Sequence, residues 1–225
     1  MATVTNSYAG SDKKFTTLDI ASVVASGINK AFLVFVWGWG KSGGEDITSV
    51  VWDPAGGDEV TLTKLTLRGN GDANMIIFHA QGDGNIAAGT HTMRIIAADS
   101  DFSNDGGGAF VLALNDVDPT TGFNNPATTN DTGTLSVTSS SGDLVAGCII
   151  ELDPDSTITP GTGDTEHQDV VQNNTHAVMN TDPSTGSSES VDWLGTSVDP
   201  RIIDAINIID GTPPPAAAQS HQMML

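Results

Sequence analysis

The chain has 225 residues, and its 28 acidic and eight basic side chains give a formal net charge of −20 at pH 7. A field of that sign repels phosphate groups, which argues against direct binding to nucleic acids or to anionic membrane surfaces. The 25 glycines and the low charged fraction, 16%, favour short strands joined by turns over long helices.

Strand-like apolar runs recur along the chain with turn residues between them. In the first half they cover Phe15–Val24, Ala31–Gly40, Asp46–Asp53, Val60–Leu67, Met75–Ala80, Thr90–Ala98 and Ala109–Asp116. After a polar stretch, Val117–Asp131, further strands are expected over TLSVTSS, DLVAGCIIEL, SSESVDWLG and RIIDAINIID, while residues 156–187 show no clear pattern. This spacing predicts an all-β fold, an antiparallel β-sandwich that is jelly-roll-like.

No internal repeat or linker is evident, which predicts one β-sandwich domain over residues 1–210. Residues 211–225 form a Pro-rich tail that we expect to be extended. Its apolar end, Met223, Met224 and Leu225, is either a disordered terminus or a segment that docks on a neighbouring subunit. The N-terminal residues lack the pattern of a signal peptide, and no apolar run reaches the roughly 18 residues that a membrane helix requires.

The run AFLVFVWGWG, Ala31–Gly40, is the most apolar in the chain. Alternate residues of a strand share a face, and here both faces are apolar. Such a strand needs cover on two sides, from loops, a third layer or another subunit. Because an exposed apolar face promotes association, we expect a homo-oligomer, with a trimer as one candidate. The expected interface consists of Phe32, Val34, Val36, Trp39 and the apolar end of the tail.

The cysteine, tryptophan and histidine residues give little indication of a catalytic or metal site. Cys148 lies in a strand-like run and is expected to be a small core residue. The four tryptophans are expected mainly in the core, with Trp39 and Trp193 the two that reach a rim where they could stack on a sugar. The five histidines are scattered without metal-ligand spacing, and no catalytic motif is present, so we do not expect an enzyme.

Asp99, Asp101 and Asp105 form the best candidate for a metal site. Oxygen ligands at alternate positions of a turn can converge on Ca²⁺. The spacing is not that of an EF-hand, so the alternative is an acidic turn without an ion. No other cofactor is expected.

The order of four segments resembles a β-sandwich family of virion structural proteins from tailed phages and marine viruses. These segments are Ser49–Trp52 with Leu62–Leu65, Ala88–Ile95, Leu114–Gly122, and Val137–Val145. The likeness covers about residues 31–210, and its motifs are turn and strand signatures without catalytic residues. It therefore implies a fold more than an activity.

The resemblance implies a structural protein of the virion surface, of the capsid decoration or cement type, made in the host cytoplasm. Its expected partners are further copies of itself and the major capsid protein or another virion protein. The alternative is a carbohydrate-binding or host-adhesion module of a tail fibre or surface protein. Such a module would bind through the loops expected at residues 117–131 and 156–187.

Overall fold

The computed structural model describes residues 1–12, 14–39, 47–53, 56–57, 59–70, 73–98, 106–130, 133–152, 157–195 and 201–211. Within these residues every regular element is a β-strand, and paired strands are antiparallel. The predicted all-β, antiparallel class is thereby confirmed. None of the described residues forms a helix long and apolar enough to cross a membrane.

Residues 3–115 form two facing sheets, which we call inner sheet 1 and outer sheet 1. Inner sheet 1 has the order β1 (Thr3–Asp12), β9 (Gly107–Asn115), β3 (Ala31–Trp39), β7 (Ala73–Gln81) and β6 (Thr63–Asn70). Outer sheet 1 has the order β2 (Thr17–Ala25), β8 (Gly89–Ala97), β4 (Ile47–Trp52) and β5 (Val60–Thr61). This alternation of early and late strands is the jelly-roll order that the sequence predicted.

Residues 123–208 repeat the same order in two further sheets. Inner sheet 2 consists of β10 (Phe123–Thr129), β17 (Arg201–Ile208), β12 (Leu144–Glu151), β15 (Thr175–Pro183) and β14 (Thr165–Gln172). Outer sheet 2 consists of β11 (Thr134–Thr138), β16 (Ser188–Gly195) and β13 (Ile158–Pro160). Each strand of the second half therefore has a counterpart in the first, from β1 and β10 to β9 and β17.

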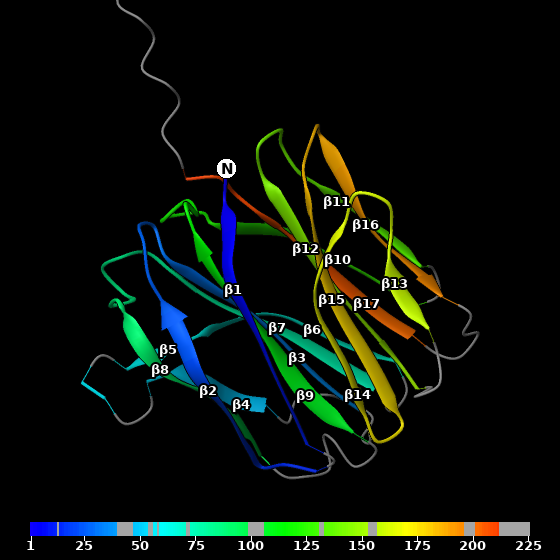
Figure 1. The fold of residues 1–225 in the computed structure, drawn as a ribbon, viewed down its shortest axis with the longest axis horizontal. Helices are drawn as coiled ribbons and strands as arrows, with labels where there is room; N and C mark the ends of the chain where they lie inside the picture. Colours follow the sequence, from blue (N-terminus) through cyan, green and yellow to red (C-terminus); the bar gives the residue numbers. More distant parts are fainter. Residues whose placement is uncertain are drawn as a thin grey trace, which may run out of the picture.

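The two inner sheets pack against each other, so the molecule has four layers (Figure 1). Their shared core takes side chains from both halves, among them Leu33, Phe35, Phe110, Cys148, Met179 and Ile206. A separate core lies between each inner sheet and its own outer sheet. The sequence predicted one sandwich over residues 1–210, whereas the structure divides these residues between two jelly rolls.

The repeat extends to strand register. Thr63 at the start of β6 is paired with His79 of β7, and Thr165 at the start of β14 is paired with Thr181 of β15. Two residues further on, both β6 and β14 contain a β-bulge at the same point of the ladder. A bulge is a defined feature of a strand pair and not a random irregularity. The two halves therefore share a backbone arrangement although no repeat is evident in the sequence.

The inner sheets face each other with opposite strand orders. β1 lies against β14, where the Ser7 hydroxyl donates to the carbonyl of His167 at 3.1 Å and accepts from Gln168 Nε2 at 2.9 Å. Across the stack β17 lies against β6 and β7. The two jelly rolls are thus related by an approximate two-fold rotation, as the subunits of an isologous dimer are.

The connection between the halves is held by hydrogen bonds at both ends. Val117 forms a β-bridge with Asp210, and the Gly211 amide donates to the Asp116 carbonyl at 2.6 Å. The Asp118 carboxylate accepts from the amides and hydroxyls of the two threonines that follow it in the turn. These bonds lower the pKa of Asp118 to about 2.

Both apolar faces of β3 are covered from within the chain. Phe32, Val34 and Val36 pack toward outer sheet 1, and the intervening residues pack toward inner sheet 2. All three, together with Trp39, are at most 5% exposed. Their assignment to a subunit interface is corrected, because they leave no surface for a partner. Met223, Met224 and Leu225 lie outside the described residues.

The tryptophans lie in the core, including the two that were expected at a rim. Trp39 is 5% exposed and Trp193 is 3% exposed, so the rim prediction is wrong for both. Trp193 packs over Gly147 of β12, where a Cβ atom would lie 2.6 Å from the indole ring. The missing side chain makes room for the ring. The prediction of a buried Cys148 is confirmed.

Candidate ligand-binding cavity

A cavity of about 480 Å³ opens at the edge of the first jelly roll, where β7 ends. Its walls are the short strand β5, the start of β6, the end of β7 and the loop from β7 to β8. The lining residues are Glu59, Val60, Thr61, Thr63, His79, Ala80, Gln81, Gly84 and Asn85. The volume lies in the range of sites that hold small ligands.

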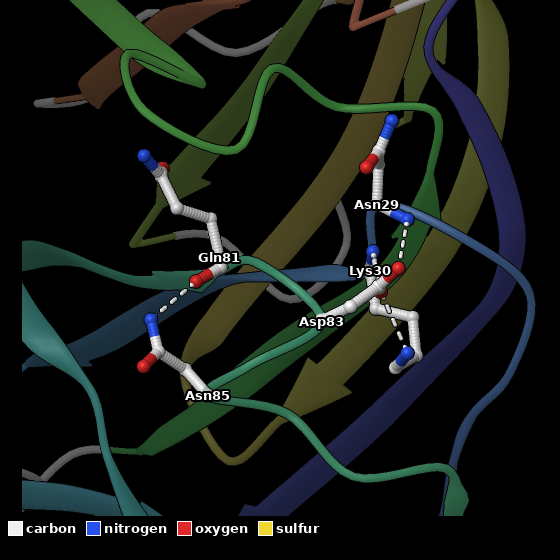
Figure 2. A network of polar contacts seen from close by, with 5 residues as sticks. All are labelled: Asn29, Lys30, Gln81, Asp83 and Asn85. Carbon is white, nitrogen blue, oxygen red and sulfur yellow. Dashed lines mark hydrogen bonds and ion pairs between the residues drawn. The ribbon is translucent and has the colours of Figure 1, made fainter.

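The loop that closes one wall of the cavity has a fixed backbone. Gly82 has φ +94°, a conformation that favours glycine, and its carbonyl accepts from the amides of Asn85 and Ile86, both at 3.0 Å. Ile86 is fully buried and anchors the loop in the core. The Asn85 side-chain amide donates to the Gln81 carbonyl at 2.9 Å, as Figure 2 shows.

Asp83 ties the same loop to the start of β3 (Figure 2). Its carboxylate accepts from the Asn29 amide at 2.9 Å, the Lys30 amide at 3.0 Å and the Lys30 ammonium at 2.6 Å. The hydrogen bonds from Lys30 are the main cause that lowers the pKa of Asp83 to about 2. Lys30 is buried, with 7% of its surface exposed, so its ammonium group depends on Asp83 for a counter-charge.

His79 lies where the cavity meets the second jelly roll. Its half-buried ring contacts the ring of Phe123 from β10, with 5.0 Å between centroids. Burial lowers the pKa of His79. The imidazole is therefore neutral at pH 7, with one nitrogen able to donate and the other able to accept.

The lining is rich in groups that both donate and accept hydrogen bonds. The lining residues that carry such groups are two threonines, Gln81, Asn85 and the neutral His79, with Val60 and Ala80 as apolar residues. Within the described part of the lining, Glu59 is the single ionisable side chain besides His79. This arrangement suits the binding of a polar, hydroxyl-bearing molecule.

No protein-family model and no curated protein matches the chain. Among solved structures, one that matches is the partial N-terminal region of an enterococcal surface protein, with 12% sequence identity and a TM-score of 0.28. The match covers 94% of this chain and 86% of the other. A likeness at that level supports no conclusion about function.

None of the site residues that the sequence predicted is among the described residues that line this cavity. Asp99, Asp101 and Asp105 fall outside the described residues. Within the part of the chain that the structure describes, no three or more His, Cys, Asp or Glu side chains are grouped so that they could hold a metal ion. The segments expected as binding loops, 117–131 and 156–187, contain β10, β13, β14 and β15.

The cavity residues were missed because they form no motif in the sequence. Glu59 and Asn85 are 26 positions apart, and only the return of β7 beside β6 brings their segments together. The one available signal is the turn-rich segment QGDGN, Gln81–Asn85, which predicts a loop but no binding chemistry.

A second polar cluster lies near the corresponding strands of the other jelly roll. The Asn180 side chain donates to Asp164 Oδ2 at 2.5 Å and to the Asp192 carbonyl at 3.2 Å. Burial, followed by the charges of Asp164, Glu189 and Asp192, raises the pKa of Asp182 to about 6. Burial likewise raises the pKa of Asp164. A buried carboxyl group whose pKa is raised makes the stability of the fold depend on pH.

Proposed function

We propose that the protein is a non-catalytic binding module that holds a hydroxyl-rich ligand, such as a sugar unit of a glycan, in the cavity beside β7. The observation that carries this proposal is the convergence of Thr61, Thr63, His79, Gln81 and Asn85 on one space. Sugar hydroxyls both donate and accept, and so do hydroxyl, amide and neutral imidazole groups.

The rigidity of the cavity supports the same role. The loop is tied to Lys30 through Asp83, to Gln81 through Asn85 and to the core through Ile86. A site that is ordered before the ligand arrives loses less conformational entropy on binding. The cavity therefore needs little rearrangement to present its donors and acceptors.

A glycan array with matched variants tests this function. Thr63→Val removes a cavity hydroxyl, and Thr165→Val makes the same change at the equivalent exposed position of β14. We expect the wild type and Thr165→Val to bind the same glycans and Thr63→Val to bind about fivefold to tenfold more weakly, the loss of roughly one hydrogen bond. A blank array, or equal loss in both variants, contradicts the proposal.

The second candidate is a structural protein of the virion surface, of the decoration type. The observation in its favour is the fusion of two jelly rolls, an architecture found in viral capsid proteins as well as in lectins, into one block with a shared core. We propose the virion surface as the setting for either role, because a fibre or decoration protein there can also bind host glycans.

Particle binding tests the second candidate. Purified protein would be mixed with capsids assembled from a tailed-phage major capsid protein, and sedimentation would show whether it binds them. A decoration protein cosediments at a fixed ratio to the capsid subunits. Free protein at every concentration argues against the role. Native mass measurement of the unbound protein tests for self-association, which must use surfaces other than the buried faces of β3.

A further inference from the structure

We infer that the cavity prefers a polyhydroxylated ligand that carries an amino group, such as an amino sugar, over neutral and acidic ligands of the same size. This inference rests on the proposed binding function. It follows from the balance of charges around the cavity, which the hydrogen-bonding groups alone do not reveal.

Glu59 gives the cavity a negative charge that nothing in its lining offsets. The Glu59 side chain is exposed at the start of the wall that β5 forms. Among the residues that the structure describes, the lining includes no lysine or arginine. An ammonium group on a ligand seated beside Glu59 therefore gains a partner, whereas a carboxylate there meets a like charge.

Neither Lys30 nor His79 changes this balance. The Lys30 ammonium is buried and lies 2.6 Å from Asp83, so its charge is neutralised by that carboxylate. The His79 imidazole is half-buried and carries no charge at pH 7. The strongly negative net charge of the chain, −20, adds a field of the same sign as Glu59.

The inferred ligand uses two parts of the site at once. Its hydroxyl groups contact the neutral donors and acceptors on β6, β7 and the loop, and its amino group faces Glu59. The ion pair is exposed, so its contribution is modest, about a two- to fivefold gain in affinity, and salt weakens it.

Titration calorimetry with three tetrasaccharides tests the inference. The probes are oligomers of glucosamine, of N-acetylglucosamine and of a uronic acid, each titrated at low and at high ionic strength. We expect the glucosamine oligomer to bind about two- to fivefold more tightly than the N-acetylated one at low salt. The uronic acid oligomer is expected to bind most weakly. Glu59→Gln should abolish the advantage, and Glu166→Gln, at an exposed position of β14, should leave it intact.

Each outcome separates this inference from the proposed function. Equal binding of the glucosamine and N-acetylglucosamine oligomers overturns the inference and leaves the glycan-binding function standing. An advantage that survives Glu59→Gln also overturns it, because the charge then acts elsewhere. If none of the three binds while the array is positive for another glycan, the inference alone fails. If the array is blank as well, both fail.

Discussion

Leu65 in β6 and His167 in β14 are the extra residues of two β-bulges that occur at the same point of the two jelly rolls. The backbone plan is therefore shared down to a local irregularity. The cavity side chains are not shared, because Thr181 stands where the first half has His79, and Pro183 stands where it has Gln81. The backbone plan is common to both jelly rolls, whereas the side chains at the cavity positions, on which the proposed binding function depends, occur in the first one.

Replacing Asp83 by alanine should lower the free energy of unfolding by about 1–2 kcal/mol at pH 7. The change leaves two backbone amides without their acceptor and the buried Lys30 ammonium without its counter-charge. The half-exposed position of the Asp83 side chain keeps the expected loss moderate. Urea unfolding of both proteins measures it.

The stabilisation that Asp83 provides should decrease at low pH. The pKa of Asp83 is lowered from 3.8 to about 2 in the folded protein, so its stabilisation is present above pH 4 and fades as the pH falls toward 2. The gap between wild type and Asp83→Ala should shrink over that range. A double-mutant cycle with Lys30→Met isolates the ion pair, and a gap that does not change between pH 7 and pH 2.5 contradicts the assignment.

The shared core predicts that the two jelly rolls unfold together. Phe35 belongs to the first half and Ile206 to the second, and both are fully buried between the inner sheets. Changing either to alanine should cost about 2–5 kcal/mol and lower the midpoint of one common transition. In a Trp193→Phe background all remaining tryptophans lie in the first half. The tryptophan fluorescence of this variant reports on the first half, and its circular dichroism reports on the whole chain. We expect the two unfolding curves to coincide; separate midpoints would argue for independent halves.

The sequence predicted the strands whose apolar pattern is strong, such as β3, β9, β12 and β17. It did not predict β15, Thr175–Pro183, which is a central strand with seven consecutive buried residues. The cause is its polar composition. The His176 and Asn180 side chains can be buried because the carboxylates of Asp169 and Asp164 accept hydrogen bonds from them. Partners that come from other strands are invisible in a local pattern.

The layering was beyond prediction for a related reason. The two apolar faces of β3 correctly indicated cover on both sides, but they do not say what supplies it. Outer sheet 1 covers the face that carries Phe32, Val34 and Val36, and inner sheet 2, whose strands lie more than 80 residues later in the chain, covers the other face. The face assigned to a subunit interface therefore belongs to the core between inner sheet 1 and outer sheet 1.

Gly147→Ala should destabilise the second jelly roll. The added Cβ would lie 2.6 Å from the Trp193 ring and 2.7 Å from Val191 Cγ2, and overpacking of that kind costs about 1–3 kcal/mol. We expect a lower melting temperature and a red-shifted tryptophan emission as the indole moves toward water. Gly186→Ala is the matched control, since no atom lies within 4 Å of its Cβ position, and an equal effect in both would refute the packing argument.

Asp182→Asn should stabilise the protein at neutral pH. Burial and three neighbouring carboxyl groups raise the pKa of Asp182 from 3.8 to about 6, so the unfolded chain ionises before the folded one. The free energy of unfolding therefore falls as the pH rises from about 4 to about 6, and the loss persists above that range. The asparagine variant carries no proton to lose at this position.

The expected gain for Asp182→Asn at pH 7.5 is about 1 kcal/mol, because solvent screens a partly exposed group. That corresponds to a rise of about 2–4 °C in melting temperature, and the gain should disappear below pH 4. Glu166→Gln removes the same charge from an exposed position of the adjacent strand β14 and should change stability by less than about 0.5 kcal/mol. If both variants stabilise equally, net charge is responsible and the carboxyl cluster has no special part in the pH dependence.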